Sequence, residues 1–124
     1  MNQKKLDEIL AKHKKWLYDE NDGERANLRS SDLRSSDLSG SDLRSSDLSG
    51  SNLSGSNLSG SNIDFSCWPL WYGSKNVKVD LRIVYQLLAH VACLDCAEKE
   101  FVKIKKVIMP YAKKSHRAKD LGIL

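Results

Sequence analysis

The side chains in this sequence that are best suited to chemistry are three cysteines and a histidine. His90, Cys93 and Cys96 follow one another at intervals of three residues, and Cys67 lies apart from them. Thiolate and imidazole groups are the usual ligands of structural zinc, so zinc binding is one interpretation of this set. On a helix, however, His90 and Cys96 would be nearly two turns apart, and cysteine is also a common core residue. We therefore predict no metal site and no cofactor.

Motifs that would indicate an enzyme are absent from the sequence. It has no phosphate-binding glycine loop, no Gly-x-Ser-x-Gly elbow and no His-Glu-x-x-His helix. Cys93 and Cys96 have the spacing of a thioredoxin-like redox pair, but no strand–helix–strand pattern surrounds them. We predict that the protein is not an enzyme and has no catalytic residues.

The candidates for binding are charged and aromatic side chains. Three arginines each follow a leucine, two aspartates precede two of these leucines, and two adjacent aromatic residues come later in the chain. The candidate partner-binding residues are Arg29, Arg34, Arg44, Asp32, Asp42, Trp71 and Tyr72. Arginine and exposed aromatic side chains often anchor protein partners. The alternative interpretation is a solvated surface with ion pairs that each contribute about 0–1 kcal/mol.

Most of these candidates lie in a repeat with a period of five residues. Eight consecutive quintets occupy residues 26–65, each with an aliphatic centre, Asp or Asn just before it, and Ala or Ser before that. The centres are Leu28, Leu33, Leu38, Leu43, Leu48, Leu53, Leu58 and Ile63. So regular a period indicates a repeat architecture.

A period of five fits neither a helix nor a flat strand. On a helix the leucines would spiral around the axis, and on a strand they would alternate between the two faces. They share one core only if the chain turns a corner in every quintet. Four corners per coil give a square tube with about 20 residues per turn and about two coils, in which leucines and serines point inward.

The other quintet positions agree with this geometry. Glycines Gly40, Gly50, Gly55 and Gly60 suit corners, where unusual backbone angles are needed. Asp or Asn beside a corner can accept hydrogen bonds from nearby backbone groups. Buried serine hydroxyls need partners, and we expect backbone carbonyls at the corners to accept from them.

This pattern resembles the pentapeptide-repeat family, and the resemblance covers about a third of the chain. It implies a right-handed quadrilateral β-helix, a handedness that the spacing alone would not fix. The stretches from Gly23 to Leu28 and from Phe65 to Trp71 are also similar to those in small pentapeptide-repeat proteins of phage and prophage genomes. The family as a whole has no single function.

The flanking segments are expected to cap the solenoid. Residues 1–20 predict an N-terminal helix whose apolar stripe includes His13, which we expect to be a packed histidine. Residues 21–72 form the repeat region, which ends in a predicted aromatic plug where Trp68 takes a leucine position and Pro69 follows.

Residues 73–124 form a predicted C-terminal helical region. We expect a short strand at 76–79, a helix capped by Asp80 and running to about Cys93, and a further helix that a capping box opens at 95–98 and Pro110 breaks. These helices have more apolar surface than two coils can cover, so we expect a homodimer or larger assembly.

Charge is distributed unevenly along the chain. Residues 1–20 have a net charge of +1, residues 21–65 have four arginines and seven acids, and residues 66–124 have eleven bases and five acids, which together give +4. No apolar run is long enough to span a membrane, and no signal peptide is recognisable. We therefore expect a cytoplasmic location, in a bacterial host cell if the chain is phage-encoded. The odd number of cysteines argues against a disulfide framework.

Three functions are consistent with these features. The first is a non-catalytic protein-interaction module, phage-borne and acting as a modulator or inhibitor of a host enzyme or defence system. The second, which the family resemblance implies, is a DNA mimic acting on a DNA-binding enzyme such as gyrase. This chain is short and only mildly acidic for that role. The third is nucleic-acid binding by the basic C-terminal helices.

Overall fold

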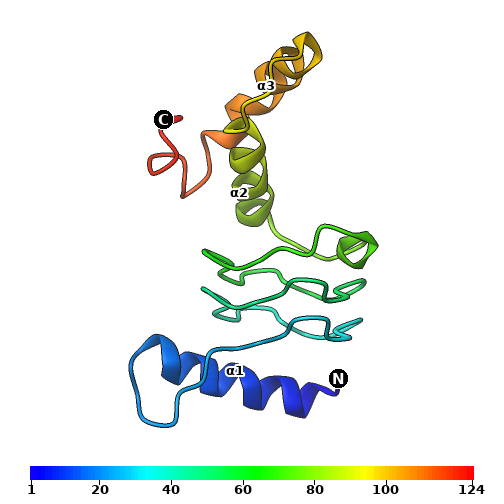
Figure 1. Cartoon of the computed structure of the whole chain (residues 1–124), viewed down its shortest axis with the longest axis vertical. Helices are drawn as coiled ribbons and strands as arrows, with labels where there is room; N and C mark the ends of the chain where they lie inside the picture. Colours follow the sequence, from blue (N-terminus) through cyan, green and yellow to red (C-terminus); the bar gives the residue numbers. More distant parts are fainter. The chain divides into compact units, whose positions relative to one another are not determined.

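The computed structural model describes residues 1–124, which form two compact units, Met1–Val79 and Asp80–Leu124. The first unit contains helix α1 (Gln3–Leu17), the repeat and the short 3₁₀ helix η1 (Tyr72–Ser74). The second contains helices α2 (Leu81–Ala92) and α3 (Lys99–Ala112) (Figure 1). No helix of the chain combines the length and the apolar character needed to cross a membrane.

The repeat is a β-solenoid whose coils contain 20 residues. Parallel bridges join Asn27 to Asp47, Asp32 to Asn52, Asp37 to Asn57 and Asp42 to Asn62. Four quintets therefore complete one coil, and the coils stack on one another in the first unit (Figure 1). The bridges are isolated because the chain turns in every quintet, which leaves too few extended residues for continuous strands.

The interior of the coil is a column of aliphatic side chains, as the five-residue period predicts. All seven central leucines are 0% exposed, and Ile63 is 6% exposed. The buried hydroxyls of Ser46, Ser51 and Ser61 each donate to the carbonyl three residues earlier, at 2.7 Å. The prediction that corner carbonyls satisfy the buried serines is confirmed at these three positions and is wrong for Ser56, whose buried hydroxyl has no hydrogen-bond partner.

The fifth residue of each quintet lies at a corner of the coil and adopts the backbone conformation that the corner requires. That residue has a positive φ in every repeat: it is glycine at four corners, and Ser30, Ser35, Ser45 and Phe65 at the others. A positive φ at the third position of a turn is the signature of type II turns, which favour glycine. The glycines predicted for corners are confirmed there, and three serines accept the same conformation.

Helix α1 covers the first coil and pairs with its open edge. The side-chain amide of Gln3 donates to the Asp37 carbonyl at 2.9 Å and accepts from the Asp37 amide at 3.0 Å. Asn2 caps the helix by accepting from the Lys5 amide at 2.8 Å. Unpaired edge groups are a site of unwanted association, so this helix protects the end of the solenoid.

His13 is a fully buried link between α1 and the coil. It is 0% exposed, its Nδ1 accepts from the Ala26 amide at 3.0 Å, and its Nε2 is 2.8 Å from the Arg44 carbonyl. Since Nδ1 accepts, Nε2 carries the proton and donates. The expectation of a packed histidine is confirmed.

Beyond the repeat, a third and irregular turn continues the solenoid. Cys67 bridges Asp47 with the regular spacing of 20 residues, but Lys78 bridges Asn57 with a spacing of 21. The extra residue lies in the segment 68–77, where Leu70 is 93% exposed. Trp68, in the predicted plug, is only half-buried.

The second unit is a helix pair with a small core. Ala89, Ala92 and Ala112 form the buried cluster, and Leu88, Ile108, Met109, Leu121 and Ile123 pack against it. Asp80 caps α2 by accepting from the Ile83 amide at 3.1 Å, as predicted.

Two expectations for the last helix are wrong. Helix α3 begins at Lys99 with no side-chain cap, so no capping box opens it at 95–98. It also runs through Pro110 to Ala112, because Ile108 and Ala112 on either side of the proline pack into the buried cluster.

Candidate functional site

The sequence-predicted binding residues lie on different sides of the coil. Because a coil takes 20 residues, residues 31–35 and 51–55 share one side, which we call the second side, and residues 41–45 and 61–65 share the opposite one, the fourth side. Arg34 and Asp32 lie on the second side, Arg44 and Asp42 on the fourth, and Arg29 on the side before the second. The structure therefore does not bring all the predicted residues into one site.

Trp71 joins the second side through the irregular third turn. Its indole Nε1 donates to the Ser51 carbonyl at 2.8 Å, and its ring lies 4.2 Å from that of Tyr72 between centroids. The absence of a side chain at Gly73 allows the Trp71 ring to pack closely against this residue, because a Cβ there would lie 2.5 Å from the ring. The aromatic pair is therefore fixed against the second side.

The side chains of this segment remain accessible to solvent. Leu70 is 93% exposed, Tyr72 is 70% exposed and Trp71 is 39% exposed. We call these three residues the aromatic patch. The hydrogen-bonded carboxylate of Asp32, with a smaller contribution from Tyr72, raises the pKa of Arg34. The second side thus brings together four of the predicted residues: Asp32, Arg34, Trp71 and Tyr72.

Both predicted arginine–aspartate pairs form with two hydrogen bonds. Arg34 Nε and Nη2 lie 2.9 and 2.7 Å from the two oxygens of Asp32, and Arg44 makes the same pair with Asp42 at 2.8 and 2.6 Å. These bonds hold the pKa of each carboxyl below its ordinary value. Arg44 also lies over the Tyr18 ring, 6.0 Å from its centroid. Both pairs are local. The Arg34–Asp32 pair is exposed, so it orients the arginine more than it stabilises the fold, whereas the Arg44–Asp42 pair is half-buried.

The side chain of every Asp or Asn in the repeat accepts a hydrogen bond from the backbone of its own corner. In all eight quintets Oδ1 accepts from the amide two residues later, at 3.0 to 3.3 Å. Each of the four bridges between the first two coils pairs one Asp with one Asn. This alternation keeps carboxylates from stacking directly on one another, where like charges would repel.

We expect the stability of the first unit to fall in acid. Hydrogen bonds from the Ser39 and Ser49 side chains and amides lower the pKa of Asp37 and Asp47 in the folded protein. Stability from a lowered pKa is complete above the unfolded value of about 3.9 and is lost as the pH falls through the folded value. The contribution of these two carboxylates to the melting temperature should therefore be lost as the pH falls below about 4.

The matched variant replaces Asp37 and Asp47 by asparagine, which the second coil already has at Asn52, Asn57 and Asn62. Asparagine keeps the bond to the turn amide but does not titrate. Thermal melts from pH 7 to pH 2.5 should show a shallower decline for this variant. Identical acid profiles would show that these two carboxylates do not link pH to stability.

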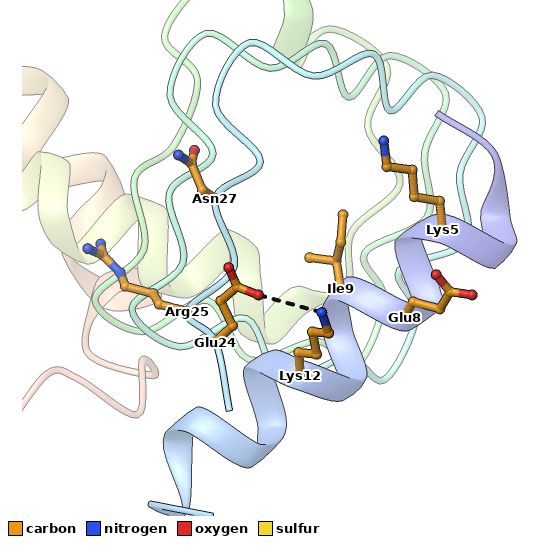
Figure 2. A pocket seen from close by; sticks show the side chains of 7 residues that line it. All are labelled: Lys5, Glu8, Ile9, Lys12, Glu24, Arg25 and Asn27. Atoms are coloured by element: carbon orange, nitrogen blue, oxygen red, sulfur yellow. Dashed lines mark ion pairs between the residues drawn. The ribbon is translucent and has the colours of Figure 1, made fainter. Parts of the chain in front are cut away.

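A second candidate site is a groove that sequence analysis did not find. It has a volume of about 290 Å³ and lies between α1 and the start of the repeat (Figure 2). Its lining residues are Lys5, Glu8, Ile9, Lys12, Glu24, Arg25 and Asn27. Lys12 and Glu24 pair across it at 3.6 Å, and Arg25 donates to the Ser45 carbonyl at 2.6 Å. The sequence carries no local signal for it, because the helix and linker meet only on folding.

The three cysteines and His90 do not come together in one site. No three His, Cys, Asp or Glu side chains are grouped as they would be around a metal ion. Cys67 belongs to the first unit, whereas His90, Cys93 and Cys96 belong to the second, and all three thiols are exposed.

Fold and surface together define a solenoid scaffold flanked by helices. Residues 24–64 match the family model described as pentapeptide repeats, in eight copies. This segment is therefore a pentapeptide-repeat segment, as the resemblance of its sequence indicated. No curated protein matches the chain.

Proposed function

We propose that the protein is a non-catalytic interaction module that binds a protein partner through the second side of its solenoid. The observation that carries this proposal is the anchored but exposed aromatic patch, with Trp71 bonded to Ser51 and Tyr72 70% exposed. Aromatic and arginine side chains on a rigid support are typical of the residues that dominate binding energy. The pentapeptide-repeat match supports a scaffold of this kind.

The proposal also covers the biological setting of the protein and the geometry of its coil. The flanks of the repeat are similar to those of phage and prophage proteins, which favours a phage-borne modulator or inhibitor of a host enzyme or defence system in the bacterial cytoplasm. A right-handed quadrilateral coil, which the family resemblance implies, would present four flat sides, of which the second carries the patch.

The test is capture of a partner by the intact chain from host lysate, compared between variants. Leu70→Ser with Tyr72→Ser removes the two most exposed side chains of the patch and keeps the anchored Trp71, and Phe65→Ser removes an equally exposed aromatic at a corner where serine occurs in other quintets. We expect the patch variant to bind the captured partner at least about 30-fold more weakly, which corresponds to about 2 kcal/mol, and the Phe65 variant to bind normally. Equal capture by both variants would contradict the proposal.

The alternative of a DNA mimic stays a prediction, and one observation weighs against it. Asp32 and Asp42 are each paired with an arginine on the same quintet, so the first coil presents fewer unpaired negative charges than its sequence contains. Duplex DNA has one charge per about 1.7 Å, a density that this surface does not approach. Unchanged gyrase supercoiling at excess protein would remove the best-known target of such mimicry.

We further propose that the chain forms a homodimer or larger assembly through its C-terminal helices. Ile104, Val107 and Tyr111 share one flank of α3 and are 46%, 68% and 50% exposed. Light scattering at micromolar concentration should give at least twice the 14.0 kDa of one chain. A mass of one chain would rule the assembly out.

A further inference from the structure

A second exposed flank of α3 forms a shallow groove that runs along the helix. It is lined by Val102, Lys105, Lys106, Met109, Pro110 and Lys113 and has a volume of about 590 Å³. These positions follow the spacing i, i+3, i+4, i+7, i+8 and i+11, which keeps them on one side of an α-helix. We call this surface the lysine groove.

Val102 and Met109, which are seven residues apart, form an apolar floor, with Lys105 on one side of it and Lys106 and Lys113 on the other. Val102 is 64% exposed, while Met109 packs against the alanine cluster and ties the floor to the core of the unit. The broader apolar side of α3, with Ile108 and Ala112, is already used in that cluster. The free strip is therefore too narrow for a helix that inserts into a lipid surface, which needs a wide apolar face.

The three lysines of the groove have no partners within the chain. None of them forms an ion pair or a side-chain hydrogen bond, whereas Lys114, which follows the end of α3, lies over the rings of Tyr85 and Tyr111. The unit Asp80–Leu124 contains nine Lys and Arg and five Asp and Glu, so it carries a net charge of +4. A second copy of this groove would bring lysines against lysines.

We propose that the lysine groove binds an acidic amphipathic α-helix of a partner protein. The apolar stripe of such a helix would lie on Val102 and Met109, and its flanking carboxylates would pair with Lys105 on one side and with Lys106 and Lys113 on the other. This is the arrangement by which coiled coils select partners: a narrow apolar seam between charged edges. The proposal rests on the second unit alone and does not depend on the aromatic patch.

The probe is a fluorescein-labelled peptide of about 20 residues, long enough to form a helix on binding. Leucines at every third or fourth position are flanked by glutamates, and a scrambled peptide keeps the composition but loses the stripe. Fluorescence anisotropy with the full chain should show saturable binding to the striped peptide with a Kd below about 1 mM. The scrambled peptide should bind at least about tenfold more weakly.

Three variants locate the site. Val102→Asn removes the exposed floor and Lys106→Glu reverses a wall charge, and each should weaken peptide binding at least about tenfold. Lys119→Glu makes the same change of net charge outside the groove and should alter the Kd less than about twofold. An equal effect of Lys119→Glu, equal binding of the scrambled peptide, or no saturable binding would overturn the proposal. So would tighter binding of a single-stranded oligonucleotide or of anionic vesicles.

Discussion

Replacing His13 by alanine should lower the unfolding free energy of the Met1–Val79 unit by about 3–5 kcal/mol. The imidazole is fully buried and joins α1 to two backbone groups of the first coil, the Ala26 amide and the Arg44 carbonyl. Alanine leaves both groups buried without a partner, at about 1–3 kcal/mol each, and adds a cavity. Few single substitutions combine these losses.

Urea unfolding followed by tryptophan fluorescence measures this change. All three tryptophans, Trp16, Trp68 and Trp71, belong to the first unit, so the signal reports that unit alone. Lys14→Ala is the matched control, because Lys14 is an exposed residue of the same helix α1. A loss below about 1 kcal/mol for His13→Ala would mean that the helix is not held to the coil by this residue.

Replacing Leu48 by alanine should cost the same unit about 3–4 kcal/mol. Leu48 is 0% exposed in the second coil, one coil above Leu28 in the interior column. Coils above and below hold its neighbours in place, so the cavity cannot collapse easily and the full cost of lost packing should appear.

Ser59→Ala is the control, since its hydroxyl lies outside the column and makes no hydrogen bond. It should change the unfolding free energy by less than about 0.5 kcal/mol. The urea midpoint should shift for Leu48→Ala while the slope stays constant. Equal stability of the two variants would mean that the leucines do not share a packed interior.

The repeat was predictable because its structural rule is local and recurs eight times. Each leucine, each Asp or Asn and each corner residue has the role that five-residue spacing assigned, since a turn within every quintet leaves one arrangement that buries all centres. The handedness of the coil could not be predicted from the repeat, because a left-handed and a right-handed coil have the same five-residue spacing.

The binding surface was predictable only residue by residue. Trp71 and Tyr72 were recognised as candidates, yet their position on the second side depends on the irregular third turn, in which Lys78 pairs with Asn57 at a spacing of 21. Nothing in the composition of residues 68–77 fixes that register. Likewise, Pro110 signals a helix end locally, but packing of Ala112 outweighs the signal.

The claim on which the rest depends is that residues 20 apart in the repeat are neighbours. Nitroxide labels at Ser39→Cys and Ser59→Cys, with the native cysteines replaced by serine, test it by dipolar broadening in electron paramagnetic resonance. The account predicts backbones about 4.8 Å apart and strong broadening for this pair, and weaker broadening for labels at 49 and 59, which are 10 residues apart on opposite sides. Stronger coupling for the 10-residue pair, as a helix or an extended chain would give, would contradict the coil.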